Sequence, residues 1–383
     1  MKNIKKALIL TLATIAISGC KGLFEKDNTE KPTKLESFKQ EVKVTSLWKT
    51  RTNSGVGKQY LKLNAALTGN VIYTSDTSGT VTATNQETGK KIWAYRASGT
   101  ISSGPTVTDN LVIVSSKIGE ITALSQKTGA IVWRAHTSSE VLARPSYQNG
   151  IIVVKAIDGK VLALSEKDGR TLWTYHKTEP NLILRAASAP AISDDNLVVG
   201  FANGTISKLT LAGGSLQWQT TVAIPEGSFA IERMVDIDAD PIIYDSTVYV
   251  ATYQGRIAAI DLFTGKAKWS HDLSSYTGMA IDKDSVFITD AKSDVWNFNR
   301  ATGKVNWRQK QLAFRNITGP LSIQKYIVVG DTEGYLHLLD KKDGHFVARE
   351  RVNKHPILTA PIGSNKNLYA VTTDGYLAKY TIS

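Results

Sequence analysis

Tryptophan recurs along this 383-residue chain at intervals of 38 to 51 residues, and other residue types keep fixed distances from it. A glycine precedes six of the seven periodic tryptophans by four residues, and a second turn residue, usually glycine, lies about ten residues earlier. Fourteen residues before that turn stands a Pro or Ala, which marks eight repeats: Ala65, Pro105, Pro145, Pro190, Pro241, Ala280, Pro320 and Pro361. Such a period is typical of architectures whose units bury a core only by stacking on their neighbours.

One repeat, residues 105–135, predicts four short β-strands. Residues 111–114 are a continuous apolar run, typical of a buried strand, and residues 120–124 alternate polar and apolar side chains. Turns at Gly119 and Gly129 separate the strands, because glycine adopts positive φ without a steric penalty. Four antiparallel strands in about forty residues predict an all-β propeller, with each Trp packed between adjacent blades.

The two ends of the repeated region complement each other. Residues 357–382 supply three strands but lack a fourth strand with Trp, and residues 44–50 supply one strand with Trp48. Pairing them would cover an otherwise exposed sheet edge. The sequence therefore predicts an eight-bladed β-propeller of four-stranded antiparallel blades over residues 44–383, closed by pairing the N-terminal strand with the C-terminal blade.

The first twenty residues have the pattern of a secretory signal peptide. A lysine-rich start precedes an apolar run, residues 7–17, that is too short to cross a hydrocarbon core of about 30 Å comfortably. The run ends in Ile17-Ser18-Gly19-Cys20, which resembles a bacterial lipobox, where the Cys is acylated and becomes the new N-terminus. Cys20 is the only Cys, which excludes an intramolecular disulfide and a Cys-based metal site. We expect a signal peptide over 1–20 and lipidation of Cys20.

The chain beyond the predicted cleavage point is basic. The formal net charge of +12 falls to +9 because residues 1–20 contain three Lys and no acid. Although a net positive charge can indicate nucleic-acid binding, an exported protein is not expected to have nucleic acid as a partner. Lys21 comes directly after the Cys, without the Asp that favours inner-membrane retention, so we expect an outer-membrane lipid anchor facing the periplasm. Residues 21–43 are polar and alternate in charge, which predicts a flexible tether.

The repeats resemble the PQQ-type propeller repeat, as in residues 257–269, IAAIDLFTGKAKW. With the lipobox and this length, the whole chain resembles the BamB family, lipoproteins of the Bam machinery that assembles outer-membrane β-barrels. The resemblance is most specific in residues 182–185 (LILR), 236–241 (DIDADP) and 329–337 (VGDTEGYLH). It implies a non-catalytic scaffold that binds periplasmic domains of BamA and assists the folding and insertion of outer-membrane proteins.

One set of connections varies in length, whereas spacing within the repeats is nearly constant. The distance from a Trp to the next Pro or Ala marker is 12 residues after Trp93, 17 after Trp173 and 23 after Trp218. In an up-and-down blade these connections share one face with the turns between second and third strands. Insertions grouped on one face indicate a binding face.

The two longest adjacent connections hold the candidate site. The first places aliphatic residues beside an Arg, an interface-like composition, although the aliphatics could equally pack beneath the loop. The second holds aspartates that could equally cap turns. The matching residues of BamB proteins bind BamA, so the resemblance implies five partner-binding residues here: Leu182, Leu184, Arg185, Asp236 and Asp238.

Motifs for catalysis and metal binding are missing. Asp236-x-Asp238-x-Asp240 resembles the start of an EF-hand loop, but Pro241 and Thr247 stand where that loop requires Gly and Glu. The six His form no metal-type pair, and no Gly-x-Ser-x-Gly motif is present. We therefore expect no enzymatic activity, no cofactor and no metal.

Two alternatives remain open. PQQ-dependent dehydrogenases share the repeat, but they resemble one another in an adjacent Cys pair and in helical and calcium-binding insertions that this chain lacks. A periplasmic scaffold for another envelope partner is the stronger alternative. Unfolded outer-membrane proteins are a further partner class, if exposed strand edges hold barrel strands by β-augmentation.

Overall fold

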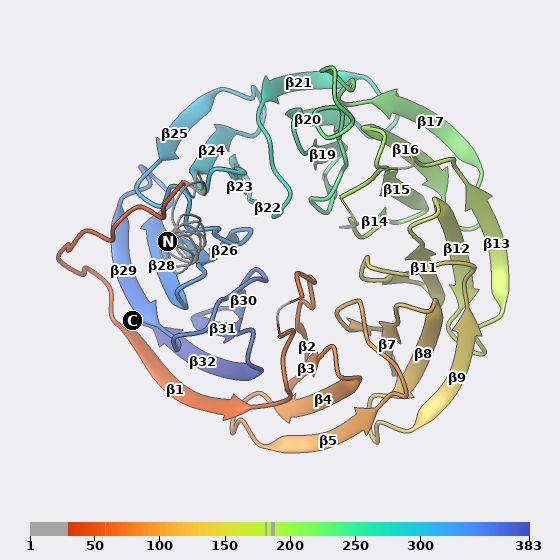
Figure 1. Cartoon of the computed structure of the whole chain (residues 1–383), viewed down its shortest axis with the longest axis horizontal. Helices are drawn as coiled ribbons and strands as arrows, with labels where there is room; N and C mark the ends of the chain where they lie inside the picture. The colour runs from red at the N-terminus through yellow and green to blue at the C-terminus, as the bar shows by residue number, and fades with distance from the viewer. Residues whose placement is uncertain (1–29, 58, 181, 185–187) are drawn as a thin grey trace, which may run out of the picture. The chain divides into compact units, whose positions relative to one another are not determined.

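The structure is a computed structural model that describes residues 30–57, 59–180, 182–184 and 188–383. The chain divides into two units, Met1–Pro32 and Thr33–Ser383. The predicted signal peptide and Cys20 lie outside the described residues. The described residues of the second unit form 32 strands in eight four-stranded antiparallel sheets and contain no helix. Figure 1 shows these sheets as the blades of a ring, with the first strand of each blade toward the centre.

The blades follow chain order. The first four are β2 (Ala66–Thr68), β3 (Val71–Ser75), β4 (Thr80–Asn85) and β5 (Lys91–Arg96); β6 (Thr106–Val107), β7 (Leu111–Ser115), β8 (Glu120–Ser125) and β9 (Ile131–His136); β10 (Ser146–Gln148), β11 (Ile151–Lys155), β12 (Lys160–Ser165) and β13 (Thr171–His176); β14 (Ala191–Ser193), β15 (Asn196–Gly200), β16 (Thr205–Thr210) and β17 (Leu216–Thr221).

The last four blades are β18 (Ile242–Tyr244), β19 (Thr247–Ala251), β20 (Arg256–Asp261) and β21 (Ala267–Asp272); β22 (Met279–Ile281), β23 (Ser285–Thr289), β24 (Val295–Asn299) and β25 (Val305–Gln309); β26 (Leu321–Ile323), β27 (Tyr326–Gly330), β28 (Tyr335–Asp340) and β29 (Phe346–Arg351); and β30 (Ile362–Ser364), β31 (Asn367–Val371), β32 (Tyr376–Ile382) and β1 (Val44–Arg51). The predicted eight-bladed fold is confirmed.

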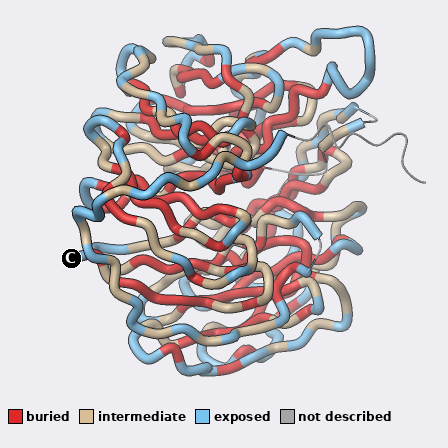
Figure 2. The backbone as a smooth tube through the Cα atoms, turned by 60° about the vertical axis from the view of Figure 1, so that its left-hand side comes forward, coloured by how far each residue is buried: buried red, intermediate tan, exposed pale blue. Residues whose placement is uncertain are grey.

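Burial within a blade follows the position of each strand. Every residue of β7 is buried, because its sheet packs against a neighbouring blade on both faces. The outer strand β9 instead buries Trp133 and exposes the residues on either side of it. Figure 2 shows the same distribution, with buried backbone along the strands and exposed backbone at the turns.

The periodic tryptophans join adjacent blades, as predicted. Trp93 on β5 lies over Gly129 of the next blade, where a Cβ would approach Trp93 Cε3 to 2.6 Å. Its Nε1–H donates to the carbonyl oxygen of Gln126 at 2.7 Å. Gly129 also has a φ of +71°, so both the turn and the indole require glycine at this position. The same contact recurs around the ring at Trp48, Trp133, Trp173, Trp218, Trp269 and Trp307.

The first strand closes the ring. β1 pairs antiparallel with β32, from Val44 opposite Ile382 to Arg51 opposite Tyr376. The Trp48 ring packs against Gly89 of the first blade, and its Nε1–H donates to the Gln86 carbonyl at 3.2 Å. The predicted closure by the N-terminal strand is therefore confirmed (Figure 1).

The segment before β1 differs from the tether predicted for residues 21–43. From Thr33 onward the chain lies on the seventh blade: Leu35 packs into the core beside that blade, and Phe38 lies 5.7 Å from Phe346 between ring centroids. The Glu41 N–H donates to the Val347 carbonyl at 2.9 Å. Residues 33–43 thus do not form a free tether. The tether prediction rested on the polar average composition of the segment, although its few apolar side chains hold it on the blade.

Candidate partner-binding face

The connections from the outer strand of one blade to the inner strand of the next lie on one face of the propeller, together with the turns between second and third strands. We call this the insertion face. Three of its connections are long: residues 52–65 between β1 and β2, residues 177–190 between β13 and β14, and residues 222–241 between β17 and β18. The last two are neighbours in the ring (Figure 1).

The insertion face exposes apolar side chains. Six large ones belong to its loops and turns: Tyr60 (54% exposed), Ile118 (74%), Leu182 (49%), Ile224 (72%), Phe229 (68%) and Ile231 (63%). On the opposite face, the single large apolar side chain exposed among the described residues is Phe263, in the turn between β20 and β21. Large exposed apolar side chains gathered on one face of a protein indicate an interaction site.

Of these exposed side chains, sequence reasoning identified Leu182 but missed Ile224, Phe229 and Ile231. Those three residues lie within the longest connection, where apolar side chains belong to no strand. Apolar residues in so long an insertion could have indicated an exposed contact surface. Leu184 is half-buried rather than exposed. Arg185 lies outside the described residues.

The predicted aspartates are not surface groups. Asp236 is 2% exposed and Asp238 is 1% exposed. Asp236 Oδ1 accepts a hydrogen bond from the Leu184 N–H at 3.0 Å, and Asp240 Oδ1 accepts one from the Ala189 N–H at 2.7 Å. The second long connection therefore holds the backbone of the first, so the two candidate segments form one structural unit.

A buried group of charged side chains lies beneath this unit. Lys155 Nζ donates to the Gly200 carbonyl at 2.5 Å and lies 3.8 Å from Glu179 Oε1. Glu179 Oε2 in turn accepts from the Ala202 N–H at 2.9 Å. Burial lowers the pKa of Lys155 and raises those of Glu179 and Asp236, because each charged form has lost contact with water.

Asp238 is the most strongly perturbed carboxylate. Burial raises its pKa to about 7, although the nearby Lys62 partly opposes the shift. Neither carboxylate oxygen of Asp238 has a hydrogen-bond partner among the described residues. Folding therefore favours the protonated acid. The contribution of Asp238 to the free energy of unfolding should fall as pH rises from about 4 to about 7, the interval in which the unfolded chain has lost a proton that the folded chain still holds.

Asp238→Asn should remove this part of the pH dependence. We expect wild type and variant to have similar free energies of unfolding at pH 4, and the variant to become relatively more stable as pH rises to 8, because an amide stays neutral. Each pKa unit corresponds to about 1.4 kcal/mol. Urea denaturation at several pH values measures the difference. Parallel pH profiles for the two proteins would show that Asp238 is ionised without cost.

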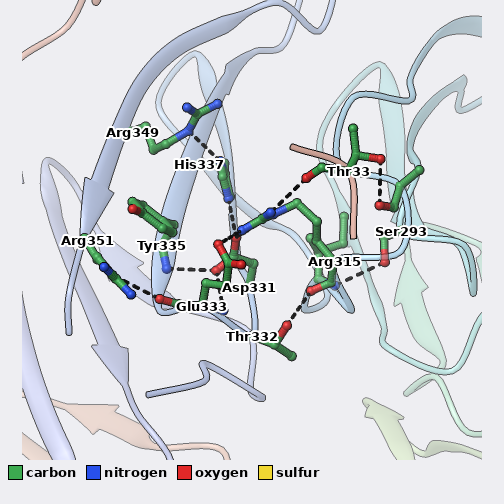
Figure 3. Close-up of polar contacts among 12 residues, drawn as sticks. Thr33, Ser293, Arg315, Asp331, Thr332, Glu333, Tyr335, His337, Arg349 and Arg351 are labelled. Atoms are coloured by element: carbon green, nitrogen blue, oxygen red, sulfur yellow. Dashed lines mark hydrogen bonds and ion pairs between the residues drawn. The ribbon is translucent and has the colours of Figure 1, made fainter. Parts of the chain in front are cut away.

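A second buried polar group lies on the seventh blade (Figure 3). Asp331 Oδ2 accepts from Arg315 Nη2 at 2.7 Å and lies 2.9 Å from His337 Nε2. Arg349 Nε donates to His337 Nδ1 at 3.2 Å, which places the imidazole proton on Nε2. Burial lowers the pKa of His337, so the ring is neutral at pH 7. Arg315 Nη1 also donates to the Thr33 carbonyl at 2.9 Å.

The polar residues of the 329–337 segment therefore have a structural role in this second buried group. It joins the turn after β27 to the connection before β26 and to residue 33. Within the described residues, no three His, Cys, Asp or Glu side chains are placed to hold a metal ion. The described residues likewise include no helix long and apolar enough to span a membrane.

Comparison with known proteins gives a consistent result. The family model described as "Outer membrane protein assembly factor BamB" matches residues 44–126 and 77–309. A protein of that name from Legionella pneumophila (strain Paris) is 43% identical over 388 residues, covering 99% of this chain and 100% of the relative. The crystal structure of BamB from Moraxella catarrhalis superimposes with a TM-score of 0.81 at 28% identity, covering 88% of this chain and 99% of that one.

A more distant likeness concerns the fold alone. The quinohemoprotein alcohol dehydrogenase of Comamonas testosteroni superimposes with a TM-score of 0.70 at 11% identity, over 88% of this chain and 76% of that one. Blade number, strand order and the glycine–tryptophan contact define this chain as an eight-bladed propeller of the PQQ-repeat class. Within that class, the full-length relatives are named assembly factors rather than enzymes. The chain belongs to the BamB family of outer-membrane protein assembly factors.

Proposed function

We propose that this chain is a non-catalytic scaffold of the outer-membrane β-barrel assembly machinery, and that its insertion face binds periplasmic domains of BamA. The observation that carries the proposal is the coincidence, on one face, of three long connections and six exposed apolar side chains. Family membership supports BamA as the partner. By holding BamA, the propeller would assist the folding and insertion of outer-membrane proteins.

The proposed site residues divide by their burial. Leu182 is exposed and suited to direct contact, and so are Ile224, Phe229 and Ile231 on the neighbouring long connection. Arg185 follows Leu184 in sequence and is proposed as a contact residue. The near-complete burial of Asp236 and Asp238 argues against direct contact by either side chain. We assign Asp236 the role of positioning the first loop through its bond to the Leu184 N–H, and Asp238 a role in the charged group beneath it.

Affinity purification of the mature chain from a detergent extract tests the proposed partner. BamA should copurify, with the remainder of the Bam complex following through it. Recovery of a different envelope protein without BamA would favour the alternative scaffold. Unfolded outer-membrane proteins appearing only when BamA is present would argue against direct binding of substrates by the propeller.

The proposed membrane anchor is the acylated Cys20, which would hold the propeller on the periplasmic side of the outer membrane. Several acyl chains give stable anchoring, whereas one binds only reversibly. Cys20→Ser should abolish acyl labelling and block processing at the lipobox, because the hydroxyl cannot replace the thiol. The propeller should still fold, since β1 begins at Val44. Mass spectrometry and acyl labelling measure both effects, and a normally lipidated variant would refute the anchor.

A further inference from the structure

A cavity of about 420 Å³ occupies the centre of the ring at the insertion face. Its wall includes the ends of seven of the connections between blades, so no single repeat forms it. The polar side chains that line it include Lys62, Asn64, Arg144, Asp240 and Thr359. Pockets of 300 to 1,000 Å³ are the usual size for small-molecule sites, so the volume suits a compact organic ligand.

Arg144 is the unusual member of this wall. Its guanidinium makes no hydrogen bond and no ion pair with the described part of the chain, and its Nε is buried without a partner. The same side chain lines a second cavity of about 560 Å³, together with residues of the inner strands β2, β6, β10, β14 and β30. An Arg carries five N–H donors in a rigid fork. Leaving the buried Nε–H of Arg144 unpaired is costly, so a ligand that pairs with it would be favoured.

Lys62 gives the cavity a second cation. Its Nζ donates to the carbonyl oxygens of Asp238 at 2.7 Å and Tyr276 at 2.5 Å, which fixes the ammonium at the wall and leaves its third hydrogen unused. Asp240 is the one acid among the lining residues, and its Oδ1 already accepts from the Ala189 N–H. The charged groups of the wall therefore comprise two cations and one engaged carboxylate.

We propose that the centre of the insertion face is a binding site for a compact organic oxyanion, held by the Arg144 guanidinium and the Lys62 ammonium. A carboxylate or a phosphate would satisfy both: each matches the guanidinium fork with two parallel hydrogen bonds. The cavity shares Tyr60 and the ends of the three long connections with the insertion face. Oxyanion binding itself requires neither BamA nor any of Leu182, Phe229 and Ile231.

Calorimetric titration of the mature lipoprotein in nonionic detergent tests the proposal. The probes are citrate, inorganic phosphate and uncharged glycerol. Citrate or phosphate should bind saturably at one site, and glycerol should not bind. Tighter binding of citrate identifies a carboxylate as the natural ligand group, and tighter binding of phosphate identifies a phosphate.

Three variants make the test specific. Arg144→Gln should weaken oxyanion binding at least about tenfold, as the loss of a charge-assisted bidentate pair predicts. Arg144→Lys should restore part of it, because the charge returns without the fork. Arg170→Gln, at an exposed arginine on the opposite face, should change nothing. BamA copurification should be unaffected in all three.

Several outcomes would overturn the site. The proposal is wrong if the wild-type protein binds neither citrate nor phosphate. It is also wrong if wild type and Arg144→Gln bind them with equal affinity. Displacement of citrate by an equal concentration of chloride would reduce the effect to general ionic attraction. Melting curves of the variants guard against unfolding. If Arg144→Gln proves unstable, Lys62→Gln replaces it, and unchanged citrate and phosphate binding there would equally contradict the proposal.

Discussion

Removal of residues 21–51 is expected to lower the melting temperature sharply or to leave the chain aggregated. The deletion takes away β1, which supplies the outer strand of the eighth blade through seven paired residues with β32. It also removes Trp48 from Gly89 and the bond from Lys49 Nζ to the Val352 carbonyl at 2.7 Å. Burial of a large aromatic side chain contributes about 2–3 kcal/mol. The loss of the strand ladder and the newly exposed edge of β32 add to this cost.

Deletion of residues 21–32 is the matched control. It keeps every contact made from Thr33 onward, and in both deletions a threonine follows Cys20, so the residue after the lipobox is the same. Differential scanning calorimetry should show the shorter deletion melting like wild type. Equal melting temperatures for the two deletions would mean that the ring is stable without its closing strand.

Leu182→Asp and Arg185→Glu are each expected to abolish most BamA binding with little effect on stability. Leu182 is half exposed, so an acid there meets water in the free protein and buries a charge in the complex. Truncation of a hot-spot residue typically costs about 2 kcal/mol or more, which is roughly a thirtyfold loss in affinity. Surface substitutions shift the free energy of unfolding by only about 0.5 kcal/mol.

The matched control is Phe263→Asp, which makes the same kind of change at an exposed apolar residue of the opposite face. Asp236→Ala belongs to a different class. It removes the acceptor for the Leu184 N–H, so it should weaken BamA binding by loosening the loop and should also lower stability, unlike the change at Leu182.

The fold could be predicted from sequence because its determinants are local and repeated. The spacing of Gly129 from Trp133 recurs in six repeats, and each copy independently indicates a turn and an outer strand. The closure of the ring could be predicted from the number of strands at each end of the repeated region, because three C-terminal strands and one N-terminal strand complete a four-stranded blade. These signals need no knowledge of contacts between distant residues.

The burial of the site residues Asp236 and Asp238 could not be predicted in the same way. Asp236 and Asp238 lie in a polar connection, and nothing in the local sequence indicates that Lys62, 176 residues away, bonds to the Asp238 backbone. The tether prediction for residues 33–43 failed for a related reason. Their average composition is polar, and Leu35 and Phe38 become informative only once the seventh blade is in place to receive them.

Copurification of BamA with the Leu182→Asp and Phe263→Asp variants, each beside a melting curve, tests the central proposal most directly. The insertion-face variant should lose BamA while melting like wild type, and the opposite-face variant should retain it. Normal BamA recovery with Leu182→Asp, or its loss with Phe263→Asp, would contradict the assignment of the insertion face.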